Sequence, residues 1–305
     1  TSTPNTSRID HIFDSVNFKN KDLILHHGDL SDSGSLYRII NDINPDEIYN
    51  LAAQSHVKIS FQIPEYTSDV NALGPLRLLE IIRHYKKKKI KFYQASSSEM
   101  FGKSKPPQNE KTLFLPRSVY AISKVFAYHS VIHYREAYDI HACNGILFNH
   151  ESPRRGVNFV TKKIVQGLVR IKNQKQKTLT LGNLYARRDW GHAKDYVESM
   201  WKILQQKKPD DFVISTNTSH SVKDFINICS KKLRINLIWR GNGMNEVGIN
   251  KDTNKIIIRI NKKYFRETEV DDLIGSFNKA KKILKWRPKF TFDKLIDDMI
   301  NNESE

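Results

Sequence analysis

Two short segments, Lys91–Glu99 (KFYQASSSE) and Tyr120–Lys124 (YAISK), decide the fold of this chain. In the first, an apolar run ends in three serines and a glutamate, as expected where a buried strand reaches the edge of a sheet. In the second, a tyrosine and a lysine stand four positions apart, and therefore on one face of a helix. Together the segments predict a catalytic group around one strand end, formed by Ser97, Glu99, Tyr120 and Lys124.

The spacing of Tyr120 and Lys124 predicts a tyrosine that acts as a base. An unperturbed tyrosine has a pKa near ~10 and is a poor base at neutral pH, but a neighbouring ammonium lowers that pKa. A shift of roughly three units requires about 4 kcal/mol of differential stabilisation. Taken alone, the pair also fits an ordinary helix that packs the aromatic ring and exposes the lysine. The preceding strand and serine cluster favour the catalytic interpretation.

Composition indicates a soluble enzyme: 305 residues suggest about two domains of roughly 150 residues each. The net charge of +17 is typical of nucleic-acid binders. However, the charge is dispersed, and its densest run, Lys86–Lys89, lacks interleaved aromatic residues, so we expect no nucleic-acid partner. We also expect no membrane contact and a cytoplasmic location, because no apolar run is long enough to span a bilayer and Thr1–His11 is too polar for a signal peptide. Cys143 and Cys229 lie far apart, which predicts neither a disulfide nor a metal site.

Strand-like and helical patterns alternate along the chain, which predicts an α/β fold with a doubly wound parallel sheet. Polar residues follow the predicted strands, as in a ligand crevice at the carboxyl edge of such a sheet. We predict a first domain over residues 1–155, with a returning segment near 183–215, and a smaller second α/β domain over residues 156–305. The expected strands are Leu23–His27, Glu47–Leu51, Lys91–Ala95, Cys143–Phe148, Thr178–Leu181, Phe212–Ser215 and Ile256–Ile260; the expected helices are Ser35–Ile43, Ser68–Tyr85 and Ser118–Tyr138, with others beginning at Ala193, Val222 and Asn278.

A family resemblance rests on six further segments, which are Asn5–His11, Asp46–His56, Phe92–Ser96, Cys143–Gly156, Arg188–Ala193 and Thr268–Asp271. In these segments the chain resembles the GDP-mannose 4,6-dehydratases, a family of extended short-chain dehydrogenases/reductases. The resemblance spans essentially the whole chain. It implies a Rossmann-like domain that holds NADP and a second domain that binds the GDP-sugar.

The resemblance implies a hydro-lyase that converts GDP-mannose to GDP-4-keto-6-deoxymannose and water, a step towards deoxysugars such as GDP-fucose. Tyr120 would take the O4 proton while the C4 hydride passes to tightly held NADP, and hydride would later return to C6. The 4-ketone acidifies C5, so Glu99, alone or with Tyr120, would remove the C5 proton and protonate the departing O6 hydroxyl. A plain dehydrogenase needs no such carboxylate, so Glu99 distinguishes dehydration. Ser97 stands where the family usually has threonine, and either residue supplies the hydroxyl.

The resemblance also implies binding residues, carried over position by position. Guanidinium groups suit a diphosphate, although a lone arginine is more often part of a surface ion pair. Trp190 and His192 are expected to be structural, and the loop Asn5–His11 implies a homodimer or homotetramer. The expected cofactor contacts are Arg8, Asp29, Leu30, Leu51, Ala52, Ala53, Gln54, Ser55, Tyr66, Lys124, His150 and Arg155, and the expected GDP-mannose contacts are Asn149, Lys163, Arg188, Arg266 and Glu269.

The chain departs from the family where a glycine-rich turn is expected. No Gly-x-x-Gly-x-x-Gly precedes Asp29, and the family would carry roughly thirty residues ahead of Thr1. We therefore expect a fragment of a longer protein rather than a degenerate relative. Val119 replaces a common proline, which removes no chemical group. Two alternatives remain: a non-catalytic scaffold of the same fold, and a related nucleotide-sugar dehydratase or epimerase, although Glu99 argues against an epimerase.

Overall fold

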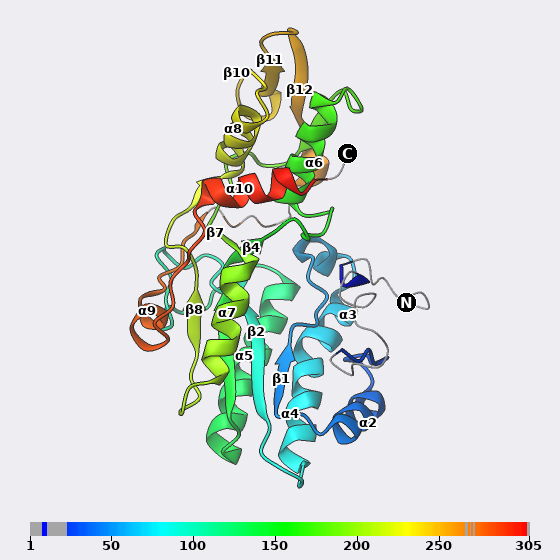
Figure 1. Cartoon of the computed structure of the whole chain (residues 1–305), viewed down its shortest axis with the longest axis vertical. Coiled ribbons are helices and arrows are strands. Elements are labelled where there is room, and N and C mark those ends of the chain that lie inside the picture. Colours follow the sequence, from blue (N-terminus) through cyan, green and yellow to red (C-terminus); the bar gives the residue numbers. More distant parts are fainter. Residues whose placement is uncertain (1–7, 11–22, 266–267, 269, 271, 304–305) are drawn as a thin grey trace.

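The computed structural model describes residues 8–10, 23–265, 268, 270 and 272–303 of the chain. Figure 1 shows two layered units stacked along the long axis, with helix α10 lying across the chain between them. The lower unit is built on a sheet in the order β1-β2-β3-β8, and the upper unit on a sheet in the order β10-β11-β12-β5. Arg266, Glu269 and the loop Asn5–His11, apart from residues 8–10, lie outside the described residues.

The first sheet is parallel and is covered by helices on both faces, which confirms the predicted fold class. Successive side chains of a strand point to opposite faces. Phe92 accordingly packs with helices α4 and α5, whereas the adjacent Tyr93 packs with helix α7. The elements of this unit are β1 Glu47–Asn50, β2 Lys91–Ser97, β3 Ala142–Leu147 and β8 Phe212–Ile214, with α2 Ser33–Ile43, α3 Pro64–Ser68, α4 Gly74–His84, α5 Val119–Tyr138, α7 Ala193–Leu204 and α9 Asn278–Ile283.

The predicted strand Leu23–His27 is wrong. Residues 23–28 have no regular secondary structure, and Ile24 and Leu25 are exposed. A strand is held by backbone hydrogen bonds to a neighbour, and no described strand lies beside this segment. The apolar pattern of Leu23–His27 was therefore insufficient to make a strand without a partner.

The predicted helix Ser68–Tyr85 is helical but not uniform. It begins as a π-helical turn, Asp69–Leu73, and continues as α4. Within the turn, the buried Asn71 amide accepts from Gln54 N–H at 2.8 Å and donates to the Gln54 carbonyl at 2.9 Å. The turn thus fixes the loop that follows β1, as π-bulges often do beside functional sites.

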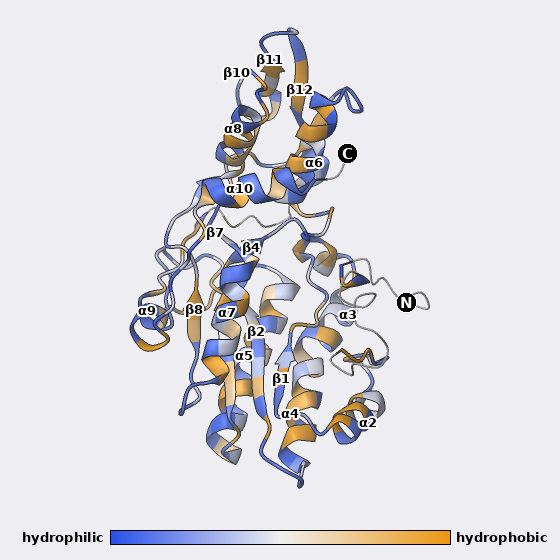
Figure 2. Cartoon of the chain, in the orientation of Figure 1, coloured by the Kyte–Doolittle hydropathy of each residue, from blue (hydrophilic) through white to orange (hydrophobic). Residues whose placement is uncertain are grey.

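The second sheet is mixed, and its core joins helices α6, α8 and α10. Figure 2 shows hydrophobic colour along β12 in this unit and along β8 in the first. Helix α8 begins with a reciprocal capping box between Ser221 and Asp224. The elements are β5 Leu179–Leu181, β10 Leu237–Arg240, β11 Val247–Asn250 and β12 Lys255–Ile260, with α6 Val160–Lys172, α8 Val222–Lys232 and α10 Phe292–Asn301.

Short strands and 3-10 turns complete the two units. β4 pairs with β7, and β6 lies between β9 and β13. These elements are β4 Asn149–Glu151, β6 Arg187–Arg188, β7 Trp190–His192, β9 His220–Ser221 and β13 Asp272–Leu273, with the 3-10 turns η1 Val57–Phe61, η3 Ser98–Met100, η4 Gly243–Asn245 and η5 Lys262–Tyr264.

Three elements from the second half of the chain pack on the first sheet. β8 pairs with β3, and α7 packs against β2, β3 and β8. Helix α9, which the sequence assigned to the substrate domain, also packs against β8, because Ala280 and Leu284 bury their side chains in that core. The proposed domain limits themselves stay a prediction. Within the described residues, none of the helices combines the length and hydrophobicity needed to cross a bilayer.

Candidate active site

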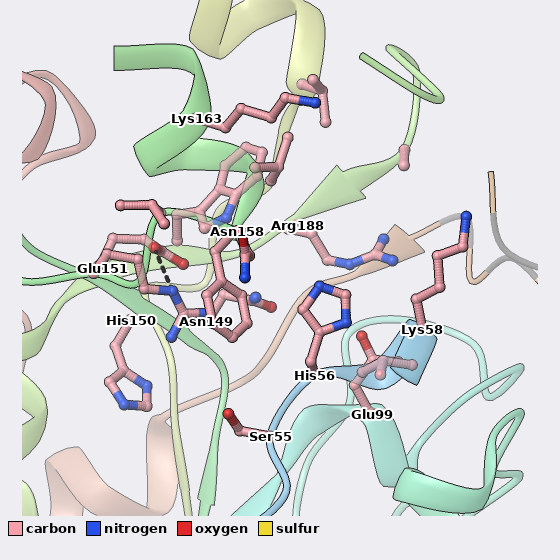
Figure 3. Close-up of a pocket in the computed structure, with 18 of the residues that line it drawn as sticks. Ser55, His56, Lys58, Glu99, Asn149, His150, Glu151, Asn158, Lys163 and Arg188 are labelled. Carbon is pink, nitrogen blue, oxygen red and sulfur yellow. Dashed lines mark ion pairs between the residues drawn. The ribbon is translucent and has the colours of Figure 1, made fainter. Parts of the chain in front are cut away.

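A cavity of about 1220 Å³ opens between the two units. Its lower wall is formed by the carboxyl ends of β1, β2 and β3 and by helix α5, and its upper wall by α6, β5 and β6. Figure 3 places Lys163 and Arg188 across from Glu99 and His56. All four predicted catalytic residues line this cavity, as do the predicted binding residues Leu51, Ala53, Ser55, Asn149, His150, Arg155, Lys163 and Arg188.

The end of β2 positions Ser97 and Glu99. Ser97 is the last residue of the strand, and its hydroxyl accepts from Glu99 N–H at 3.2 Å, which caps the turn η3. The turn brings the Glu99 carboxylate to the cavity wall while leaving the residue largely buried. A strand that passes directly into a tight turn explains why the serines and the glutamate reach one place.

The first turns of α5 position Tyr120 and Lys124. Ser118 caps the helix by accepting from Ala121 N–H at 3.1 Å, so both side chains rise from the same face. The Lys124 ammonium donates to the Ala95 carbonyl at 2.8 Å and lies 5.9 Å from the centre of the Tyr120 ring. The lysine is thereby anchored to β2 beside the phenol.

The predicted lowering of the Tyr120 pKa is wrong for this structure. Burial raises that pKa, and the nearby Glu99 carboxylate adds to the rise, while a hydrogen bond with Ser97 opposes it. Burial also lowers the pKa of Lys124 to about 8. The sequence argument failed because it counted the charge of the ammonium and neglected the desolvation of both groups.

The strand β4 and the loop after it form the adjoining wall. His150 Nδ1 lies 3.0 Å from the Phe148 carbonyl oxygen, and its ring stacks on Tyr196 at 4.8 Å. Burial lowers the pKa of His150, which favours a neutral imidazole. The Arg155 guanidinium stacks over the Phe159 ring at 3.7 Å. This wall therefore offers a neutral ring and a cation side by side.

The upper wall contributes cations. Arg188 is buried on β6 and donates to the carbonyls of Arg187 and Val270, both at 2.7 Å. The Lys163 ammonium on α6 lies 3.8 Å from the centre of the Tyr264 ring. Cations fixed in this way suit a negatively charged ligand such as a diphosphate.

Several predicted cofactor residues lie away from the cavity lining. Asp29 is exposed. The N–H and the hydroxyl of Ser31 both donate to its carboxylate, and these hydrogen bonds lower the pKa of Asp29. Tyr66, on α3, is 52% exposed. Leu30 is buried against α4, Ala52 and Gln54 belong to the loop after β1, and Arg8 donates to the Arg154 carbonyl at 2.9 Å.

The cavity also includes residues to which the sequence gave no role. His56 caps η1 through its Nδ1, and Lys58 donates to the Lys263 carbonyl, so η1 and η5 are joined across the cavity. Glu151 lies next to His150 at the end of β4. Its place in the polar run Asn149–Glu151, directly after a buried strand, was the available signal.

A family model described as GDP-mannose 4,6 dehydratase matches residues 1–299. The chain belongs to this family. It is 51% identical to GDP-mannose 4,6 dehydratase of Drosophila melanogaster, covering 100% of this chain and 78% of that protein. It is 53% identical to GDP-mannose 4,6 dehydratase of Dictyostelium discoideum, covering 93% of this chain and 80% of that protein.

Solved structures of lower identity share the fold of this GDP-mannose 4,6 dehydratase family member. RMD from Pseudomonas aeruginosa, complexed with NADPH, has a TM-score of 0.78 at 18% identity, over 96% of this chain and 94% of that one. The dTDP-glucose 4,6-dehydratase from Bacillus anthracis, in complex with NAD, has a TM-score of 0.78 at 19% identity, over 99% and 85% of the two chains. They confirm the α/β architecture.

The donor set at the reaction end fits the nicotinamide part of a dinucleotide. Lys124 and the Ser97 and Tyr120 hydroxyls can bind ribose and carbonyl oxygens, and Arg155 can bind a phosphate oxygen. Arg155 Nε itself is buried and forms an ion pair with Glu151 Oε2 at 3.0 Å rather than a hydrogen bond. These residues would hold the nicotinamide half of the family's cofactor, which is the half that reacts.

Proposed function

We propose that this chain converts GDP-mannose to GDP-4-keto-6-deoxymannose and water, as an NADP-dependent hydro-lyase. One observation supports this most: Ser97, Glu99, Tyr120 and Lys124 line one wall of a cavity whose opposite wall carries fixed cations. A hydroxyl, a phenol and an ammonium would suffice for oxidation of an alcohol. The additional carboxylate suits the removal of water.

Each residue has a role that its position allows. Ser97 and Tyr120 hydrogen-bond O4 of the mannose, and Tyr120 takes its proton. Lys124, held by the Ala95 carbonyl, places an ammonium beside the phenol. NADP, when bound, supplies the reversible hydride carrier. Glu99 transfers protons at C5 and O6.

The upper wall holds the nucleotide part of the substrate. Arg188 and Lys163 bind diphosphate oxygens, and Asn149 adds an amide from β4 in the adjoining wall. Arg266 and Glu269 belong to the same proposal through the family resemblance. A diphosphate between fixed cations would place the sugar at the reaction end.

The decisive experiment incubates the purified chain with GDP-mannose and NADP, followed by mass spectrometry. We expect a product lighter by one water that borohydride reduces to a GDP-6-deoxyhexose. UDP-glucose and dTDP-glucose serve as controls, because turnover of either in preference to GDP-mannose would indicate a related nucleotide-sugar dehydratase.

A non-catalytic scaffold is the second candidate. If the folded chain gives no product alone but does so with an added glycine-rich βα segment, catalysis is retained in a longer protein. Failure of that rescue supports the scaffold.

We also propose a cytoplasmic homodimer or homotetramer. Large apolar side chains exposed on α5 and on the π-helical turn before α4 support self-association, namely Ile122, Phe126 and Leu73. Sedimentation equilibrium would test this, since a monomer at all protein concentrations contradicts it.

A further inference from the structure

We propose that Glu151 is a positioning residue that aims Arg155 at the cofactor and at the same time fixes helix α6, which carries the substrate-binding Lys163. This inference rests on the proposed function. It concerns a carboxylate to which neither the sequence nor the proposed reaction gives a role, although it lies in the cavity wall.

Glu151 is an almost fully buried charge. Its residue is 2% exposed, and it ends the short strand β4, which pairs with β7. Burying a carboxylate is costly unless charged and hydrogen-bonding partners compensate it. Two partners are present here: the Thr161 hydroxyl donates to Oε2 at 2.6 Å, and Arg155 Nε lies 3.0 Å from the same oxygen.

The pair orients Arg155. Figure 3 marks the ion pair at Glu151 with a dashed line. Two contacts hold the Arg155 guanidinium. The Glu151 carboxylate contacts its Nε edge, and the Phe159 ring packs against one of its faces. The remaining N–H groups are thereby left for an anion. Nε is not aligned for a hydrogen bond, so the attraction is that of the charges.

The Thr161 hydrogen bond reaches the other side of the cavity. Thr161 is fully buried in the first turn of α6, whose preceding residue Phe159 gives no side-chain cap. A carboxylate beside this helix N-terminus is favoured by the helix dipole. Lys163 follows two residues later on the same helix, so one carboxylate oxygen ties a cofactor residue to a substrate residue.

A second buried carboxylate provides a matched control. Glu246 is 3% exposed and also contacts one hydroxyl and one cation: it accepts from Tyr185 Oη at 2.7 Å and from Lys223 Nζ at 2.5 Å. None of these three residues lines the cavity. Removing either carboxylate should lower the free energy of unfolding, but only removal of the Glu151 carboxylate should alter ligand binding.

The test compares Glu151→Gln, Thr161→Val and Glu246→Gln, using calorimetry for NADP binding and steady-state kinetics for GDP-mannose. We expect Glu151→Gln to weaken NADP binding about tenfold, because a misaimed Arg155 makes a weaker charge-assisted contact with the cofactor. Thr161→Val should raise the KM for GDP-mannose several-fold while leaving NADP affinity nearly unchanged. Glu246→Gln should alter neither.

Hydrogen exchange of the ligand-free protein provides a readout that needs no cofactor. Glu151→Gln should increase deuterium uptake over residues 152–165, and Glu246→Gln should not. Unchanged uptake there, or equal NADP affinity in both glutamine variants, overturns the positioning role. If the wild-type chain binds NADP without turnover, the proposed function fails while this inference stands; if it does not bind NADP, the cofactor role of Glu151 is overturned as well.

Discussion

At the reaction end of the cavity, Tyr120 and Lys124 stand on a helix that packs over the buried strand of Ser97. At the outer rim, just after β1, the large apolar side chain of Leu51 is exposed. The reaction end is supported by core on both faces of its sheet, whereas the rim has no described strand beyond β1. The predicted catalytic residues thus lie in the better packed region. A further segment or subunit would change the packing most at the rim.

The largest expected effect is at the reaction end. Glu99→Gln keeps the volume and removes the carboxylate, so dehydration should fall by about 10³-fold, within the range for loss of a general acid or base. Exchange of the C5 proton with deuterated water, followed by mass spectrometry, should cease as well. The control Glu246→Gln should retain both activities. Dehydration at a near wild-type rate in Glu99→Gln would remove this residue from the reaction.

The second prediction concerns the pH response of Lys124. Its pKa of about 8 means that the ammonium beside Tyr120 is lost above that pH, so kcat/KM should decline above pH 8. Stability changes in the opposite sense. The unfolded chain keeps this proton up to a pKa near 10.5, so it binds more protons than the folded chain between pH 8 and 10.5.

Stability from this group therefore rises with pH over that window, by up to about 3 kcal/mol, and is lost as the pH falls through 8. Urea unfolding of the wild type and of Lys124→Met across this window measures the difference. Parallel curves for the two proteins would show that Lys124 titrates as an ordinary lysine and that the reaction end is wetter than the structure indicates.

The third prediction contrasts the two adjacent arginines of β6, of which only Arg188 lines the cavity. Arg188→Met should raise the KM for GDP-mannose about tenfold or more, because a charge-assisted contact to a phosphate is lost. Arg187→Met is the matched control, since Arg187 points to Ser219 and Asp224 outside the cavity. Equal KM changes would mean that general positive charge, rather than a fixed contact, holds the substrate.

The contrast between the two regions also explains which features the sequence predicted. Ser97, Tyr120 and Lys124 were found because strand ends and helical spacing are local, and local patterns survive folding. The predicted strand Leu23–His27 was wrong because a strand needs hydrogen bonds to a neighbouring strand, which its own sequence does not specify. The predicted direction of the Tyr120 pKa shift was wrong because desolvation of the phenol depends on the packing of the whole core. Glu151 received no role because its partner Thr161 reaches it only after α6 has packed, which spacing alone does not reveal.

The smallest expected effect is at the rim. Leu51 is 55% exposed although it lines the cavity mouth, so Leu51→Ser should change the free energy of unfolding by no more than about 0.5 kcal/mol. Leu79→Ala, in the buried core of α4, should cost about 2–5 kcal/mol in the same urea titration. A loss above about 1 kcal/mol at Leu51, beyond the usual surface range, would mean that a neighbouring segment or a second copy covers the rim in solution. The rim would then be part of a core, and the difference between the two regions would come from what covers β1 rather than from how this chain packs.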